Sequence, residues 1–135
     1  MIKEISIKTS RRNELIDITQ QVQDFVSASK LNEGICLIFV PHTTAAVTIN
    51  ENADPDVKKD LLQKLSQLIP EVDNYSHSEG NSDAHVKSSL VGCSIAVPFK
   101  ESKLLLGTWQ GILFCEFDGP RQRKAVLSLV QGLSR

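Results

Sequence analysis

The chain has 135 residues, of which 41% are hydrophobic and 23% charged, and its net charge is −1. This composition is typical of one soluble domain (residues 1–135) that removes about two-thirds of its unfolded surface from water. The near-neutral charge and the few aromatic residues argue against nucleic acid or a membrane surface as partner. The apolar runs are too short to span a membrane, and the first residues lack the apolar core of a signal peptide. An odd number of cysteines without a CxxC pair predicts reduced core thiols and a cytoplasmic location.

The first half of the chain predicts a strand, a helix and two further strands. Residues 1–8 alternate apolar and polar side chains, as a half-buried strand does. Apolar residues at helical spacing predict a helix over residues 19–30 with Thr19 as its N-cap. Residues 35–40 are apolar throughout, which predicts a central strand covered on both faces. Residues 44–50 are a further strand candidate.

Two more helices follow. Asp54-Pro55 predicts a helix start, because proline is favoured at the first helical position after a cap residue. The apolar stripe of this helix is expected to be buried, and Pro70 marks its end. Ser82 is expected to cap a short helix that Gly92 ends.

The last third of the chain predicts strands, with a turn at Gly119-Pro120. The expected strands are residues 93–99, 103–106, 111–117 and 123–130. Because helices and strands do not alternate strictly, we predict an α+β domain with mixed or antiparallel sheet layers and about three helices.

Residues 75–85 are the most informative stretch, because they carry two of the three histidines, His77 and His85. Their Ser, Asn, Asp and Gly residues favour turns, and a polar loop of this kind indicates a place for chemistry. Together with His42 these histidines could form a zinc-like ligand set, with Asp83 as the acceptor that orients an imidazole. The alternative is an anion site, because the amides after Ser82 would lie at a helix N-terminus.

Two segments in the middle of the chain hold further candidates. His42, Thr43 and Thr44 follow the apolar strand, where ligands are commonly bound at a sheet edge. A hydrogen bond from His42 to a loop carbonyl is the structural alternative. Asn50 and Glu51 lie between a strand and a helix cap without an evident structural role, so they are also candidates.

The C-terminal candidates surround the last turn. Gln110 has no obvious packing role beside the only tryptophan, which belongs either to the core or to a site. Alternation places Glu116 and Asp118 on one face, where their partner is a metal or an arginine, Arg121 or Arg123. An ion pair is the simpler interpretation. If Arg121 does not form an ion pair, its guanidinium is suited to bind a phosphate with two hydrogen bonds.

In this order, these segments resemble the YjbQ family, small proteins named secondary thiamine-phosphate synthases. The resemblance covers nearly the whole chain and rests on residues 41–45, residues 50–56, His77 with residues 79–85, and residues 107–111 continuing to 116–121. It implies a compact α+β fold and a homotrimer whose sites lie near subunit boundaries. It also implies a pocket lined by His42, His77, His85, Asn81, Asp83 and Glu116.

The resemblance implies a transferase that joins a pyrimidine methyl pyrophosphate to a thiazole phosphate and releases pyrophosphate. The catalytic candidates are His42, His77, His85 and Glu116, with His85 as general acid and Glu116 or Asp118 beside the cation. The candidates for binding this phosphorylated substrate are Thr43, Thr44, Asn50, Glu51, Asn81, Ser82, Asp83, Gln110, Asp118 and Arg121. We expect no organic cofactor but a divalent metal of the magnesium or zinc type, with His42, His77 and His85 as candidate ligands.

Two other functions fit the same residues. Imidazole suits zinc-type ions better than magnesium, so a metal-dependent hydrolase of a phosphorylated metabolite is the first alternative. A non-catalytic trimer that binds such a metabolite is the second.

Overall fold

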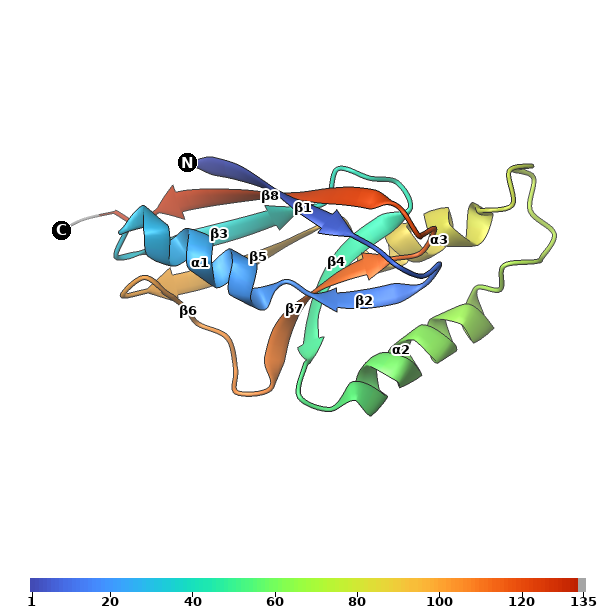
Figure 1. Cartoon of the computed structure of the whole chain (residues 1–135), viewed down its shortest axis with the longest axis horizontal. Helices are drawn as coiled ribbons and strands as arrows, with labels where there is room; N and C mark the ends of the chain where they lie inside the picture. Colours follow the sequence, from blue (N-terminus) through green and yellow to red (C-terminus); the bar gives the residue numbers. More distant parts are fainter. Residues whose placement is uncertain (134–135) are drawn as a thin grey trace.

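Two antiparallel sheets organise the computed structural model, which describes residues 1–133 (Figure 1). Sheet A has five strands in the order β1 (Ile2–Lys8), β8 (Gln122–Gln131), β3 (Glu33–Phe39), β5 (Ser94–Lys100) and β6 (Lys103–Leu104). Sheet B has three, in the order β2 (Glu14–Asp17), β7 (Gln110–Glu116) and β4 (Ala45–Glu51). The helices are α1 (Thr19–Ser29), α2 (Pro55–Leu68) and α3 (Ser82–Val91). The predicted α+β fold with three helices is confirmed.

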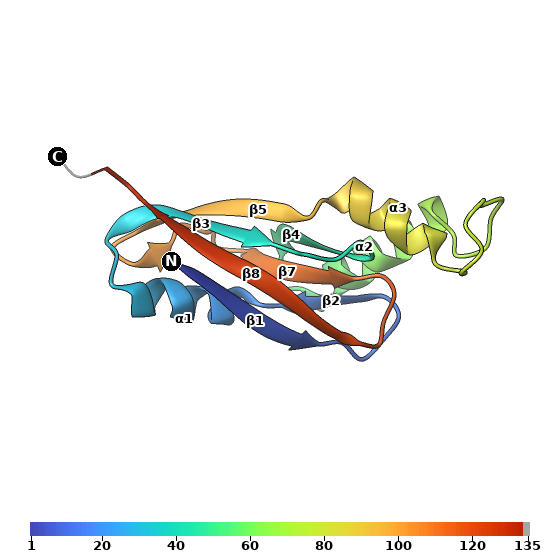
Figure 2. The same cartoon turned by 90° about the horizontal axis from the view of Figure 1, so that it is seen from above.

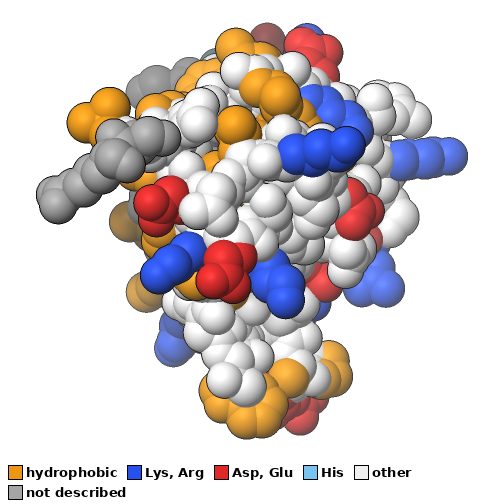
Figure 3. Space-filling view, turned by 90° about the vertical axis from the view of Figure 1, so that its left-hand side faces the viewer, with side chains coloured by type: hydrophobic (Ala, Val, Ile, Leu, Met, Phe, Trp, Pro, Cys, Tyr) orange, Lys and Arg blue, Asp and Glu red, His pale blue; other side chains and the backbone are white. Residues whose placement is uncertain are grey.

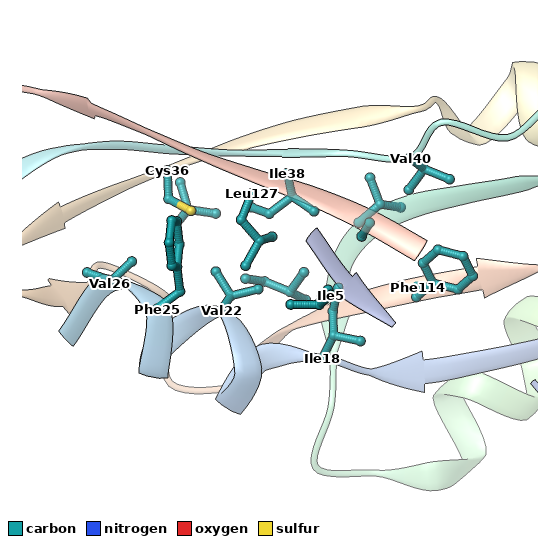
Figure 4. Packing of buried hydrophobic residues seen from close by; sticks show 14 of the residues in the cluster. Ile5, Ile18, Val22, Phe25, Val26, Cys36, Ile38, Val40, Phe114 and Leu127 are labelled. Atoms are coloured by element: carbon teal, nitrogen blue, oxygen red, sulfur yellow. The ribbon is translucent and has the colours of Figure 1, made fainter. Parts of the chain in front are cut away.

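The main core lies between the inner face of sheet A and a second layer formed by α1 and sheet B. Val22 and Phe25 of α1 point toward Cys36 and Leu127 of sheet A, as Figure 4 shows. Phe114 brings sheet B into the same cluster. Burial of these apolar side chains, at about 25 cal/mol per Å², is the main favourable contribution to folding.

The outer face of sheet A is not covered by the described chain. Cys36 and Ile38 of β3 are buried, but Ile35, Leu37 and Phe39 between them are 46%, 38% and 40% exposed. Figure 2 looks onto this face and shows no helix in front of its strands, and Figure 3 shows hydrophobic side chains along the same edge of the molecule. The prediction that residues 35–40 are covered on both faces is therefore wrong for one chain: the strand is central, but only one of its faces is covered.

The helices α2 and α3 lie on the other side of sheet B (Figure 1). A second, smaller core of Ala46, Ala84, Cys115 and Phe117 fills the space beneath them. Leu62 and Leu65 of α2 pack against it only in part, and no residue of α2 is fully buried. The stripe predicted to be buried is thus only half-buried, because α2 lies at the periphery.

The helix ends confirm one predicted cap and correct two. The side chain of Asp54 accepts a hydrogen bond from the amide of Asp56 at 2.9 Å, as an N-cap does. Thr19 is not a cap, because its hydroxyl accepts from the amide of Ile112 at 2.8 Å and ties α1 to β7. Ser82 is the first residue of α3 and follows the N-cap Asn81.

The strand boundaries lie within a few residues of the predictions, but β2 was not predicted from the sequence. Its four residues are too few for a clear alternation. Within residues 1–133 no helix has the length and apolar character needed to cross a membrane.

Candidate functional site

Two neighbouring clefts, each of about 520 Å³, share His42, Thr43 and Cys93. They lie where β3 ends, β4 begins, and α3 passes into β5. The first cleft also contains residues of α3 and its C-terminal end, namely Ala45, His85, Ser88, Ser89 and Gly92. The second extends toward the start of β8 and contains Phe39, Val40, Pro41, Thr44, Arg121 and Arg123. The structure therefore brings His42, His85 and Arg121 to one hollow region.

His42 is held as a neutral imidazole. The backbone N–H of Lys124 donates to its Nε2 at 3.1 Å, so this nitrogen is the acceptor and the proton resides on Nδ1. Burial, together with the positive charge of Arg123, lowers the pKa of His42 below its usual 6.5. The structural alternative for His42 was a bond to a loop carbonyl. The ring instead accepts from the amide of Lys124 in β8, which leaves Nδ1–H as a donor.

Glu116 and Arg123 form a buried ion pair beneath the second cleft. The guanidinium donates from Nε to Glu116 at 2.9 Å, and its Nη2 donates to the other carboxylate oxygen and to the hydroxyl of Thr44 at 2.8 Å. Thr9 adds a hydrogen bond to the carboxylate at 2.8 Å. Burial alone would raise the pKa of Glu116, but the bonds from Arg123, Thr9 and the amide of Asp118 outweigh it and lower the pKa.

This pairing decides the roles of Glu116 and Thr44. The Glu116 side chain is 0% exposed, so its carboxylate is enclosed by partners rather than presented to a ligand. Thr44 is also buried and serves as an acceptor for Arg123. Both residues position the Arg123 guanidinium, and Thr44 also lines the second cleft, so its predicted contact with substrate stays a prediction.

Asp118 and Arg121 form a second, more accessible pair. Arg121 donates from Nε to the carbonyl of Asp118 at 2.9 Å and from Nη2 to its carboxylate at 3.0 Å. The amide of Asn81 donates to the same carboxylate at 2.9 Å, which links the N-terminus of α3 to this turn. The Arg121 side chain remains 49% exposed, so its guanidinium is oriented without being enclosed.

His85 and His77 lie side by side at the start of α3. Their ring centroids are 5.5 Å apart and the rings are nearly perpendicular. His77 is exposed and its Nε2 lies 3.6 Å from the carboxylate of Glu79. Both histidines and Ser82 line a smaller cleft of about 320 Å³, so His85 lies between this cleft and the one that contains His42.

Asp83 does not orient an imidazole. Its carboxylate is fully buried and accepts from Arg12 at 3.1 Å and from the ammonium group of Lys87 at 3.2 Å. Lys87 is also buried, bonds to Asn13, and lies 5.8 Å from the ring centroid of Phe117. Asp83 thus anchors α3 to the rest of the chain, which fixes the place of His85.

Three predicted residues lie at the opposite end of sheet B. Asn50 and Glu51 end β4, and Glu51 is paired with Gln110 at the start of β7. The six steps from Ala45 to Glu51 place them about 20 Å from the His42 end. Their side chains bond to nearby backbone amides, of Glu51, Ala53 and Gly107 respectively. Within one chain they do not join the clefts, and the neighbouring tryptophan is exposed rather than in the core.

The expected metal set is not assembled by one chain. Among residues 1–133 no three His, Cys, Asp or Glu side chains converge closely enough to hold an ion. His77 and His85 are adjacent, but His42 uses Nε2 for the amide of Lys124. The described residues therefore do not fit a metal centre built from the three histidines of a single chain.

The residues of this region that were not selected from the sequence as site candidates include Lys87, Ser88, Cys93 and Arg123. Ser88 is 7% exposed, and its Oγ has no hydrogen-bond partner among the described residues although Ser88 lines the first cleft. Cys93 was expected to be a core thiol but is exposed. Arg123 had been considered only as an ion-pair partner. Alternation along β8 was the available signal, since it turns Arg123 inward with Ala125.

Comparison with known proteins gives a consistent result over the whole chain. The family described as UPF0047 protein YjbQ-like matches residues 3–132. The UPF0047 protein MJ1081 of Methanocaldococcus jannaschii is 56% identical over 96% of this chain and 94% of its own length. The UPF0047 protein YugU of Bacillus subtilis is 51% identical over 96% and 99%, respectively.

Solved structures agree. An uncharacterized conserved protein of the YjbQ/UPF0047 family from Clostridium acetobutylicum has a TM-score of 0.93 at 51% identity, covering 95% of this chain and 99% of that one. A YbjQ-like protein of unknown function from Sulfolobus solfataricus has a TM-score of 0.94 at 36% identity, covering 98% and 97%. The chain belongs to the YjbQ-like UPF0047 family, as the resemblance implied.

Proposed function

We propose that this YjbQ-like protein binds a phosphorylated small molecule in the clefts around His42 and acts on it as a secondary thiamine-phosphate synthase. The observation that carries the proposal is the convergence of His42, His85 and Arg121 on one hollow region, above the buried Arg123. Hydrogen-bond donors and positive charge directed at one cleft are what a phosphate group requires.

The donors in the clefts are already oriented. Two N–H groups of Arg121 bond to Asp118, which fixes the guanidinium and leaves Nη1 for a phosphate oxygen. His42 offers Nδ1–H, because its Nε2 is occupied by the amide of Lys124. Thr43 and Ser88 add hydroxyl groups. Such fixed donors lose little conformational freedom when a ligand binds.

In the proposed reaction the bond between the pyrimidine methylene carbon and a pyrophosphate oxygen breaks, and the thiazole nitrogen bonds to that carbon. Negative charge grows on the leaving pyrophosphate, where Arg121 and the Nδ1–H of His42 stabilise it. His85 donates a proton to the leaving group as general acid. Glu116 contributes by holding Arg123 rather than by touching the cation.

The two alternatives receive less support from the geometry. A metal-dependent hydrolase needs an ion held by the protein, and no suitable group of three ligands exists within residues 1–133 of one chain. The proposed steps use only the side chains of this protein. A non-catalytic metabolite-binding protein would use the same clefts, and it is distinguished from the synthase only by turnover.

The test measures two quantities on the purified protein: binding of inorganic pyrophosphate by calorimetry, and the rate of thiamine phosphate formation. We expect His85→Ala and Arg121→Ala to lower kcat/KM by about 10²-fold or more, the range typical of a lost acid catalyst or charge-stabilising group. Lys103→Ala, exposed on β6, is the matched control and should retain the wild-type rate.

Wild-type rates in both site variants would refute the proposed roles. Pyrophosphate binding that the variants abolish, without product formed by the wild type, would assign the protein as a non-catalytic binder.

We further propose that the protein assembles as a homotrimer in which copies cover the outer face of sheet A. The exposed row formed by Ile35, Leu37 and Phe39 supports this, because large apolar side chains on a central strand are usually covered. Phe39 also lines the second cleft, so a copy packed on this face would lie next to the site.

A further inference from the structure

Cys93 is the one exposed cysteine among the described residues, and it lies in both clefts. It precedes β5, and its carbonyl accepts a hydrogen bond from the amide of Val40 at 2.7 Å. The clefts share only His42, Thr43 and Cys93, so Cys93 lies where the two hollow regions meet. A group attached to this sulfur would occupy space in both.

We propose that Cys93 is a modification site for small-molecule disulfides, and that the mixed disulfide blocks ligand binding in the clefts. The second part rests on the proposed phosphate-binding function. The first part stands independently, because it concerns only the exposure of the thiol.

The other two cysteines are protected from the same chemistry. Cys36 lies in the main core and Cys115 in the smaller one, and both are buried. Burial raises the pKa of Cys36 to about 11 and that of Cys115 to about 12. Because the thiolate is the reactive form, these two sulfurs are inert in the folded chain.

Ser88 provides a second, independent indication that a ligand binds in the space beside Cys93. Its side chain is more than nine-tenths buried and lines the first cleft, yet its Oγ has no partner among the described residues. Buried hydroxyl groups are normally hydrogen-bonded, so an unpaired one at a cleft indicates a partner that binds there. A disulfide adduct on Cys93 and such a ligand would compete for one space.

The chemistry is a thiol–disulfide exchange. The Cys93 sulfur loses its proton and attacks one sulfur of the disulfide, a new S–S bond forms and the original one breaks. The other half of the disulfide leaves as a thiolate and takes up a proton. Cys93 is oxidised and the released half is reduced, so the step needs no further oxidant, and a thiol reductant reverses it.

The experiment treats the native protein with the aromatic disulfide dithiobis(nitrobenzoate) and follows the released chromophore. In the native protein we expect one thiol per chain to react fast, which releases one equivalent of chromophore. After unfolding, all three cysteines should react. The fast equivalent should be lost in Cys93→Ser, and inorganic pyrophosphate should slow it in the wild type. Calorimetry then compares pyrophosphate binding before and after treatment: we expect loss in the wild type and no change in Cys93→Ser, whatever its starting affinity.

The outcomes separate the two ideas. A native protein without a fast equivalent, or a fast equivalent that persists in Cys93→Ser, would refute Cys93 as the modification site. Unchanged pyrophosphate binding after complete modification would refute the block while leaving the proposed function intact. An unmodified wild type that does not bind pyrophosphate would overturn the proposed function and the block together, and the accessible thiol would remain.

Discussion

The neutral state of His42 follows from burial of its ring, from the charge of Arg123 and from one hydrogen bond. The amide of Lys124 occupies Nε2, and the buried Arg123 nearby disfavours a second positive charge. We expect the imidazole resonances of His42 to titrate with a pKa below 6.5 in an NMR experiment, with His42→Gln identifying the signal. Because the unfolded chain takes up this proton at higher pH than the folded one, the stability contribution of His42 is lost as the pH falls below 6.5. A midpoint at or above 6.5 would contradict the geometry.

Glu116 is expected to contribute strongly to stability, because its fully buried carboxylate is paired with the buried Arg123. Replacing it by Gln removes the charge that compensates the buried Arg123 but keeps the shape. Breaking a buried pair in this way costs roughly 3–5 kcal/mol. Urea unfolding monitored by circular dichroism measures the difference.

The matched control for Glu116→Gln is Glu4→Gln, which removes a carboxylate paired with Lys124 at the surface. We expect it to change the free energy of unfolding by less than about 1 kcal/mol. Equal effects of the two substitutions would show that the Glu116–Arg123 pair is not enclosed in solution.

At the scale of single residues, the sequence predicts some ion-pair partners well. Alternation along the last strands places Glu116 and Asp118 near Arg121 and Arg123, and both ion pairs exist. Lys87 has the i,i+4 spacing that favours a pair with Asp83, but the second cation, Arg12, was not predictable, because it comes from the β1–β2 connection. Only the folded chain shows that Arg12 reaches it.

At the scale of elements, α2 depends more than the other helices on local interactions. No residue of it is fully buried, so packing contributes little and its cap contributes proportionately more. We expect Asp54→Ala to lower the free energy of unfolding by about 1 kcal/mol, the usual cost of a lost N-cap. Chemical denaturation measures it.

Asp60→Ala on the same helix is the control, because this exposed carboxylate lies beyond the first turn. The free energy of unfolding of this variant should stay within about 0.5 kcal/mol of the wild-type value. If both substitutions had the same effect, the Asp54 hydrogen bond would not be what stabilises α2.

The caps show why element ends are harder to predict than elements. Proline after Asp54 leaves one interpretation, and it was correct. Thr19 and Ser82 have the right residue types, but a hydroxyl bonds equally well to a neighbouring strand or remains in the first turn. The strand β2 was not predicted for a related reason. Its four residues are extended because they pair with β7, and their sequence alone does not indicate this pairing.

At the scale of the whole molecule, the outer face of sheet A should determine the association state. Leu37 lies at the centre of that face, paired with Ala96 on one side and Ser128 on the other. We expect the wild type to be a homotrimer and Leu37→Lys to be a monomer with an unchanged far-ultraviolet spectrum. Light scattering coupled to gel filtration measures the mass.

Gln21→Lys is the matched control, because it adds the same charge on the exposed side of α1. It should leave the trimer intact. A trimeric Leu37→Lys variant would place the contact elsewhere, and a monomeric wild type would exclude the assembly.

The site as a whole was predicted only in part, because sequence reasoning does not show which candidates meet. His42, His85 and Arg121 do share one hollow region. Asn50, Glu51 and Gln110 have the same polar character but lie at the far end of β4 and β7. Residue type identifies candidates for a site, whereas strand direction decides which end of a sheet each one occupies.

That separation of about 20 Å along sheet B bears on the symmetry of any assembly. A two-fold axis makes each contact reciprocal between the same two copies, whereas a closed three-fold ring passes each contact on to the next copy. In the proposed trimer, a ring that sets the Gln110 end of one copy against the His42 end of the next would build each site from two copies. Complementation reveals this: mixed and refolded Arg121→Ala and Gln110→Ala chains regain activity only when one site draws on two copies.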